Sequence, residues 1–448
     1  MNTRDIQKIV HCESEAAAEY LINTRRDFHR YPEPGWCEFR SASKIARELS
    51  ALGYSLTTGT GAVTPAECHG LPDAPVLDSW YGTAISEGAD PVFVQSMRGG
   101  YTGITAALTT GPGPVTAIRF DMDALDIPES SESGHRPFDE GFASEHSGVS
   151  HACGHDGHMA IGLGTARVLA ALQHLIPGTV KLIFQPAEEG VRGAGAMVSA
   201  GALDDVQNLL GLHLFPDLPL GHTVCGTSDF SATTKFDIRF TGTASHAGGA
   251  PEAGHNALMA ASTAILNMYA IPRHSGGTTR INVGTIHGGD SRNTICPGVY
   301  LTAETRGDTD SLNNYMFTNA ERIIHAAAEM HRCRADIIPS GSAPSAQSSP
   351  SLSLILEAVA GTIAGLQSVG AHKKGLSEDF TLMMRHVQDK GGHAAHISFG
   401  AGIHDGPLRN LHTPDFDFDE RAMSLAVELL VRCVLETNTA SPLIAGRS

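Results

Sequence analysis

Short runs of consecutive apolar residues alternate along much of the chain with stretches whose apolar or small residues recur at helical spacing. The runs have the length of strands buried on both faces. The expected strands are 115–120, 179–184, a run near 210 and 393–400; the expected helices are 14–30, 38–54, 159–172, 193–203, 351–366 and 419–436. This alternation predicts an α/β domain with a mixed, mostly parallel sheet flanked by helices.

A different pattern begins near residue 226. Residues 233–242 alternate between apolar and polar positions, as a half-exposed strand does. The segments that follow read as a helix at 255–270, strands at 280–286 and 298–307, and a helix at 310–331. This order predicts a smaller α+β domain. We therefore expect a discontinuous catalytic domain, residues 1–225 plus 341–448, interrupted by an inserted domain at 226–340.

Two other segments have the composition of connections. Residues 59–103 are rich in Gly, Pro, Thr and Ser and have poor periodicity, which indicates a long insert. Residues 340–350, "SGSAPSAQSSP", form a polar connector back to the first domain.

Composition narrows the class of protein. The net charge of −17 disfavours nucleic acid and anionic membranes as partners, and no apolar run reaches the length of a membrane span. The N-terminus has no apolar signal-peptide core, so a cytoplasmic location is expected. The eight cysteines are scattered without a CxxC pair, which favours reduced thiols over a disulfide framework, a zinc finger or a redox motif.

Polar clusters follow several of the predicted strands. They are "DMDALD" after 115–120, "QPAEEG" after 179–184 and "LHLFPD" after the run near 210, while "RNLHTPDFDFDE" precedes the last helix. Ligands of open α/β sheets bind at the carboxyl ends of the strands. The repeated delivery of Asp, Glu and His to these ends predicts a functional site there.

The stretch "SHACGHDGHMA" adds soft and borderline metal ligands to that site. The combined donor candidates are Cys153, His155, Glu188, Glu189, His213 and His412. If one of the two adjacent glutamates stays free, five donors remain; these exceed one tetrahedral site and suggest two metals sharing a ligand, with the free carboxylate acting as base.

Each donor candidate, taken alone, has a simpler interpretation. Cys153 would be a small buried hydrophobe, and His412 or the Glu188–Glu189 pair would be solvated loop residues. His151 and His158 are expected at the surface or beside the ligands. Only the joint placement at strand ends favours a metal centre.

Eight motifs together resemble the dinuclear metallo-amidohydrolase and aminoacylase family, which includes carboxypeptidase G, hippurate hydrolase and the plant auxin-conjugate hydrolases. In chain order they are "DFHRYPEPGWCEFRSA", "RFDMDAL", "HACGHDGHMA", "IFQPAEEG", "GLHLFPDLPLG", "SHAGGAPEAGHNAL", "LSEDF" and "LHTPDFDFDE". They cover nearly the whole chain in the family's order. The long insert and the "HRYPEPGW" opening resemble the branch that cleaves p-aminobenzoyl-glutamate.

The resemblance implies roles for the catalytic domain. The implied metal ligands are Cys153 as a bridge, His155, Glu189, His213 and His412. Glu188 would be the general base that deprotonates the attacking water and then protonates the leaving amine. Asp123 matches an aspartate that orients a ligand histidine. Asp121 falls where other branches have a histidine ligand, and here His155 takes that place.

The resemblance also implies a lid and dimerisation role for the inserted domain. His246 matches a lid histidine that reaches the scissile carbonyl, in some relatives from the neighbouring subunit. Asn256 and Asn293 would be polar substrate contacts. Arg306 suits a substrate carboxylate, with a surface salt bridge as the alternative.

The function implied is metal-dependent hydrolysis of an N-acyl amino acid. p-Aminobenzoyl-glutamate is the expected substrate, with indole-3-acetyl-aspartate or another aromatic N-acyl amino acid as alternatives. Two divalent ions are expected, Mn²⁺ first and Zn²⁺ as the alternative. The chain would form a homodimer through the lid or a heterodimer with a homologous partner chain. The alternative class is a non-catalytic member of a two-chain hydrolase.

Overall fold

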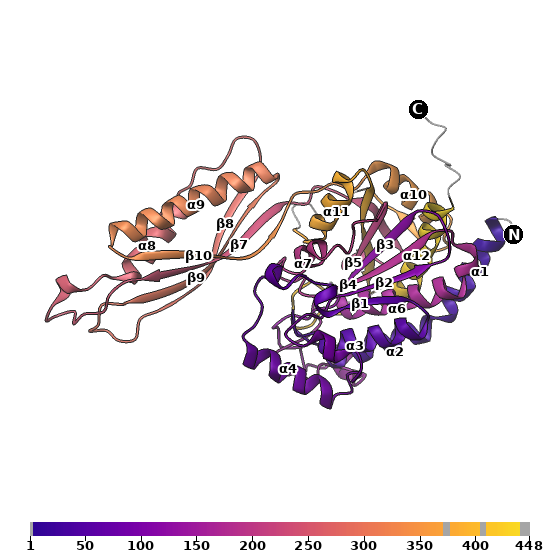
Figure 1. Ribbon diagram of the computed structural model, residues 1–448, viewed down its shortest axis with the longest axis horizontal. Helices are drawn as coiled ribbons and strands as arrows, with labels where there is room; N and C mark the ends of the chain where they lie inside the picture. The colour runs from indigo at the N-terminus through magenta and orange to yellow at the C-terminus, as the bar shows by residue number, and fades with distance from the viewer. Residues whose placement is uncertain (1–2, 371–376, 404–408, 440–448) are drawn as a thin grey trace.

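A computed structural model describes residues 3–370, 377–403 and 409–439. The chain folds around two separate sheets (Figure 1). The helices are α1 (Thr3–Ala16), α2 (Ala18–Arg30), α3 (Phe39–Ala51), α4 (Ala74–Ser86), α5 (Arg136–Asp139), α6 (His155–Ala171), α7 (Ala194–Ser199), α8 (Ala257–Tyr269), α9 (Asp310–Met330), α10 (Pro350–Ala360), α11 (Phe380–Asp389) and α12 (Arg421–Asn438). The strands are β1 (Ser55–Thr58), β2 (Ile104–Thr109), β3 (Val115–Asp121), β4 (Thr179–Gln185), β5 (Asn208–Pro219), β6 (His222–Thr227), β7 (Ala232–Thr241), β8 (Thr279–Gly288), β9 (Gly298–Gly307), β10 (Arg334–Ala343), β11 (Gln367–Ser368) and β12 (His393–Gly402).

The larger sheet has eight strands in the order β1-β2-β4-β3-β5-β12-β6-β11. Its centre, β4-β3-β5-β12, is parallel, whereas β2 and β6 join this centre in antiparallel pairings. The predicted mixed, mostly parallel sheet flanked by helices is confirmed. Because the central strands are parallel, their carboxyl ends meet at one edge of the sheet, where the predicted polar clusters lie.

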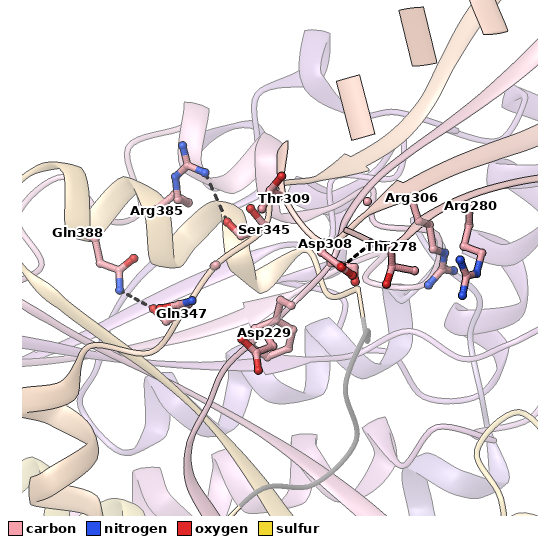
Figure 2. Close-up of a pocket in the computed structure, with 14 residues that line it drawn as sticks. Asp229, Thr278, Arg280, Arg306, Asp308, Thr309, Ser345, Gln347, Arg385 and Gln388 are labelled. Carbon is pink, nitrogen blue, oxygen red and sulfur yellow. Dashed lines mark hydrogen bonds between the residues drawn. The ribbon is translucent and has the colours of Figure 1, made fainter. Parts of the chain in front are cut away.

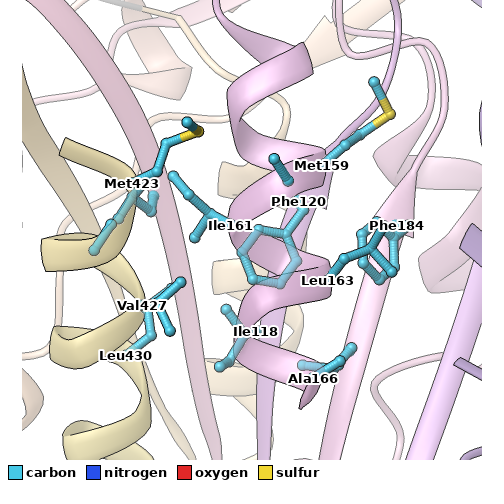
Figure 3. Close-up of a cluster of buried hydrophobic side chains, with 14 of the residues drawn as sticks. Ile118, Phe120, Met159, Ile161, Leu163, Ala166, Phe184, Met423, Val427 and Leu430 are labelled. Carbon is cyan, nitrogen blue, oxygen red and sulfur yellow. The ribbon is translucent and has the colours of Figure 1, made fainter. Parts of the chain in front are cut away.

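Alternating side chains of the central strands belong to two hydrophobic cores, one on each face of the sheet. Ile118 and Phe120 of β3 pack against α6, whereas Ala117 belongs to the core under α7 and α11. Figure 3 shows α6 beside α12, with Ile118, Phe120 and Phe184 of the strands next to α6. The small residues of α6 allow this close packing, since a Cβ at Gly162 would come within 2.7 Å of Phe184.

The smaller sheet has the order β10-β7-β9-β8, with all its pairs antiparallel, and packs with α8 and α9 around a separate core. We refer to residues 232–343 as the lid. β10 was not predicted; it occupies residues that the polar pattern had assigned partly to the connector 340–350. The chain crosses between the two sheets after β6 and again after β10, and Figure 1 shows the lid projecting from the larger unit.

The predicted insert at 59–103 contains α4 and three single-turn 3₁₀ helices. Leu77, Val94 and Met97 bury their side chains in the main core, so the segment belongs to the packed body of the domain. None of the helices in the described ranges combines the length and the hydropathy that a membrane span requires.

Candidate metal centre and active site

The predicted ligands come from four segments that meet at the carboxyl edge of the parallel strands. Glu189 follows β4 and His213 lies in β5, while Cys153 and His155 lie just before and at the start of α6. α6 begins four residues earlier than the sequence pattern predicted, which puts His155 in its first turn. His412 lies in the loop that precedes α12.

The donor atoms converge on the sulfur of Cys153. Its Sγ lies 3.3 Å from Nε2 of His213 and 3.3 Å from Nε2 of His412. Nε2 of His412 also lies 3.2 Å from a carboxylate oxygen of Glu189. The donors of Cys153, His155 and His213 lie within 4.8 Å of one another, as do those of Cys153, Glu189 and His412. The structure thus brings all five predicted ligands together in two groups that share Cys153.

Hydrogen bonds at Nδ1, the ring nitrogen on the side away from the cluster, orient His155 and His213. Nδ1 of His155 lies 2.7 Å from the main-chain oxygen of Asp123, and Nδ1 of His213 lies 2.8 Å from that of Leu214. Each Nδ1 therefore donates, which leaves the lone pair of Nε2 directed at the cluster. The buried Nε2 of His155 has no hydrogen-bond partner in the described structure. This is the arrangement of metal-binding histidines, and the mixed S, N and O donors suit a divalent transition metal.

Burial and nearby carboxylates together favour protonated forms of two of these ligands, and a bound cation would reverse that preference. Burial and the neighbouring Glu189 and Glu188 hold the pKa of the Cys153 thiol well above its usual value. Burial alone would lower the pKa of His155, but Asp121 and Asp123 outweigh it and raise the pKa to about 10. A bound cation reverses both preferences, because it favours the thiolate and the neutral imidazole.

Asp123 holds the loop that carries the two adjacent glutamates. Its carboxylate oxygens accept hydrogen bonds from the main-chain N–H groups of Glu188 and Glu189, each at 2.9 Å. The resemblance implied that Asp123 orients a ligand histidine. Its main-chain oxygen lies 2.7 Å from Nδ1 of His155, and its nearest carboxylate oxygen lies 3.5 Å from the same atom.

Glu188 lies in a buried acidic group next to the ligands. Its oxygens lie within 4.8 Å of those of Glu378 and Asp379. Burial, followed by the charges of Glu378, Glu189 and Asp379, raises the pKa of Glu188 well above its usual value, and Arg119 opposes the shift. Arg119 is fully buried and lies 3.0 Å from Glu378 and 3.2 Å from Asp379. The raised pKa favours the protonated form of Glu188.

Asp121 lies beside the cluster, and a donor oxygen of its carboxylate lies within 4.8 Å of ring nitrogens of His155 and His158. Its carboxylate lies 2.5 Å from Nδ1 of His158 and 2.6 Å from Arg119, and its nearest oxygen is 3.7 Å from Nε2 of His155. Nε2 of His158 accepts from the main-chain N–H of Leu214. His151 and His158 are 1% and 0% exposed, so the surface alternative for both is wrong.

A buried arginine ties the α6 segment to the His412 segment. The guanidinium of Arg25 donates to Asp156 at 2.7 Å, Asp417 at 3.0 Å and Glu420 at 3.1 Å. His412 has a left-handed backbone, with φ of 61°, and its N–H donates to the main-chain oxygen of Ala152. A non-glycine residue holds such a conformation only where its surroundings enforce it.

A cavity of about 440 Å³ opens over the cluster and reaches the lid. Its walls include Glu188 and four of the five ligands, all but His155, on one side, and Lys235 and Arg306 of the lid on the other. Arg306 donates from Nε and Nη2 to Glu304, at 2.9 and 3.1 Å, and Lys235 lies 3.6 Å from the same carboxylate. Arg306 thus makes the salt bridge of the alternative interpretation and also lines the cavity.

The other predicted lid residues lie at the opposite end of the lid. His246 and Asn293 belong to the loops after β7 and β8, and the main-chain N–H of Ala247 donates to the oxygen of Asn293. Asn256 caps α8 by accepting from the N–H of Leu258. The ten-residue β9 separates this end from Arg306 by about 30 Å at ~3.3 Å per residue. The structure does not bring these three residues to the centre of their own chain.

The fold and the donor cluster define a metal-dependent amidohydrolase, and comparison with known proteins gives its family. The model for peptidase family M20/M25/M40 matches residues 117–436, and the chain belongs to this family. The chain is 47% identical over 419 residues to indole-3-acetyl-aspartic acid hydrolase of Enterobacter agglomerans, covering 93% of this chain and 95% of the relative. It is 46% identical over 421 residues to one of the subunits of p-aminobenzoyl-glutamate hydrolase from Escherichia coli K12, covering 93% of this chain and 96% of the relative.

Solved structures agree with this assignment. An aminobenzoyl-glutamate utilization protein from Klebsiella pneumoniae superposes with a TM-score of 0.82 at 39% identity, covering 94% of this chain and 97% of the other. The YxeP protein of Bacillus subtilis, described as a dinuclear metal-binding peptidase of family M20, superposes with a TM-score of 0.64 at 25% identity over 95% and 99% of the chains.

Proposed function

We propose that this protein hydrolyses p-aminobenzoyl-glutamate to p-aminobenzoate and glutamate, with indole-3-acetyl-aspartate as the second candidate substrate. The observation that carries the proposal is the single cavity that joins the donor cluster, Glu188, and the lid cations Lys235 and Arg306. The two relatives named for these substrates match almost the full chain. The complete set of donors and base supports catalysis by this chain over a non-catalytic role.

In this proposal Cys153, His155, Glu189, His213 and His412 hold two divalent ions, Mn²⁺ or alternatively Zn²⁺. When bound, the ions supply Lewis acidity for the scissile carbonyl and the attacking water. Glu188 takes the proton from the attacking water and delivers it to the leaving nitrogen. Arg306 and Lys235 hold the substrate carboxylate and thereby position the amide over the cluster.

A substrate panel tests this function. The metal-free protein is loaded with Mn²⁺ or Zn²⁺ and assayed with p-aminobenzoyl-glutamate, indole-3-acetyl-aspartate and hippurate. We expect the highest kcat/KM for p-aminobenzoyl-glutamate, and no turnover after chelation. Hydrolysis of hippurate alone, or of none of the three, would contradict the proposal.

We further propose that His246 serves the active site of a second chain, because about 30 Å of lid separates it from its own. The lid offers a surface for such a partner. β8 is an edge strand, and Leu266, Tyr269 and Ile286 are 73%, 46% and 46% exposed on α8 and β8. The partner is a second copy or a homologous chain.

All eight cysteines are free thiols, which supports the proposed cytoplasmic location.

Mixed dimers separate action across the dimer from action within one chain. His246→Ala and Glu188→Gln should each be nearly inactive alone. Mixed and allowed to exchange, they should recover about a quarter of wild-type activity, because half the dimers are mixed and each then has one intact site. Size-exclusion chromatography checks that dimers form. No recovery from confirmed mixed dimers would show that His246 does not act across the dimer.

A further inference from the structure

Two arginines lie directly opposite each other where the lid meets the larger unit. Arg280 of β8 and Arg306 of β9 are paired across the two antiparallel strands. Figure 2 shows their guanidinium groups side by side, extending in the same direction. Like charges in this position destabilise a sheet unless an anion compensates them.

The carboxylates within reach do not compensate both arginines. Glu304 is bound by Arg306 and approached by Lys235. Arg280 donates only to the main-chain oxygen of its neighbour Thr279, and within the described residues it forms no ion pair. Asp229 and Asp308 also line the cavity beside Arg280, but in the described part of the chain neither forms an ion pair with it, and Glu304 is the carboxylate that Arg306 and Lys235 share.

Arg306 links this group to the metal centre. It lines the 440 Å³ cavity over the donor cluster and also a larger cavity of about 990 Å³, which Arg280 lines as well. Phe230 is the other residue shared by both cavities. Starting from the cluster, a ligand would meet Lys235 and Arg306 first and Arg280 beyond them.

We propose that Arg280 binds the side-chain carboxylate of an acidic amino acid whose α-carboxylate lies on Arg306 and Lys235. The chain is then selective for N-acyl conjugates of glutamate or aspartate over conjugates of neutral amino acids. This inference rests on the proposed amidohydrolase function. A guanidinium without a protein counter-ion can form a charge-assisted, bidentate pair with a carboxylate.

The test compares p-aminobenzoyl-L-glutamate with p-aminobenzoyl-L-glutamine, which differ only in the side-chain charge. The wild-type protein should prefer the glutamate conjugate in kcat/KM by roughly 10- to 100-fold, the range of one charge-assisted hydrogen bond. Arg280→Gln should abolish this preference by slowing the glutamate conjugate alone. Arg306→Gln should instead slow both conjugates, because both retain the α-carboxylate.

Arg239→Gln is the matched control. Arg239 is an exposed arginine on β7 of the same sheet, and it lines neither cavity. Its substitution changes the net charge of the chain by the same amount as Arg280→Gln does. It should leave the preference intact. Equal losses for both conjugates in Arg280→Gln, or an unchanged preference, would overturn the inference while leaving the hydrolase function in place.

A binding measurement covers the case in which the protein hydrolyses neither conjugate, so that the proposed function itself fails. L-Glutamate and L-glutamine are titrated calorimetrically onto the Mn²⁺-loaded full chain. Both present the same α-amino and α-carboxylate groups, so only the side chain differs. Tighter binding of glutamate that Arg280→Gln removes would support the inference, and equal binding of the two amino acids would overturn it.

Discussion

Glu188→Gln is expected to lower kcat by about 10²- to 10⁴-fold, the usual contribution of a general base. The amide cannot take the proton of the attacking water, although its shape is that of the carboxylic acid. Because Asp123 holds the loop through the main-chain N–H groups of Glu188 and Glu189, the substitution leaves the backbone in place. Metal content should therefore stay at the wild-type level.

The contrasting variant is Glu189→Gln, one residue further along the chain. Glu189 contacts His412 in the donor cluster, so its loss should reduce bound metal as well as rate. Metal content by mass spectrometry and kcat by steady-state assay separate the two cases. Near-normal turnover of fully loaded Glu188→Gln would remove Glu188 from the mechanism.

The location of the ligand cluster could be predicted from the sequence because it follows a general rule for parallel sheets. Buried strands were recognisable from their apolar runs, and the parallel arrangement brings their carboxyl ends together. Glu189 and His213 were therefore expected to lie close together before any contact was known. Cys153, His155 and His412 were added by their residue types and by the family resemblance.

Residues whose position depends on strand register could not be found in this way. Lys235 and Arg280 sit on strands that the alternation predicted, but the pattern does not say which residues face each other across β7, β9 and β8. Only the observed pairing of Lys235 with Glu304, and of Arg280 with Arg306, reveals the group of cations. Asp121 and His158 were likewise missed as a buried pair, since their contact joins segments 37 residues apart.

Two of the missed elements lie in segments of irregular or mixed composition. α4 lies in the Gly- and Pro-rich region 59–103, and β10 runs into the Ser-rich connector. His396 stands between alanine and isoleucine in β12, which reads as an ordinary buried strand, yet it lines the cavity over the cluster. Tertiary packing overrides local composition in each of these cases.

Cys153→Ala is expected to disrupt the centre as a whole. The sulfur belongs to both donor groups and lies 3.3 Å from Nε2 of both His213 and His412. Removing it takes a ligand from each metal position, whereas loss of His412 would take a ligand from one group only. Substitution of a group that merely supports a ligand costs about 10- to 100-fold in metal affinity, so the loss of a shared ligand should exceed about 100-fold.

Cys225→Ala is the matched control for this substitution. Cys225 is 6% exposed, as Cys153 is, but it lies on β6 and belongs to neither donor group. After dialysis against trace Mn²⁺, the control should retain two ions per chain and wild-type kcat, and Cys153→Ala should retain neither. Thermal unfolding with and without Mn²⁺ gives a second measurement, because a bound ion raises Tm only where the site exists. If Cys153→Ala binds two ions with wild-type affinity and shows the same rise in Tm, then Cys153 is a packing residue, and the shared ligand must be another member of the cluster.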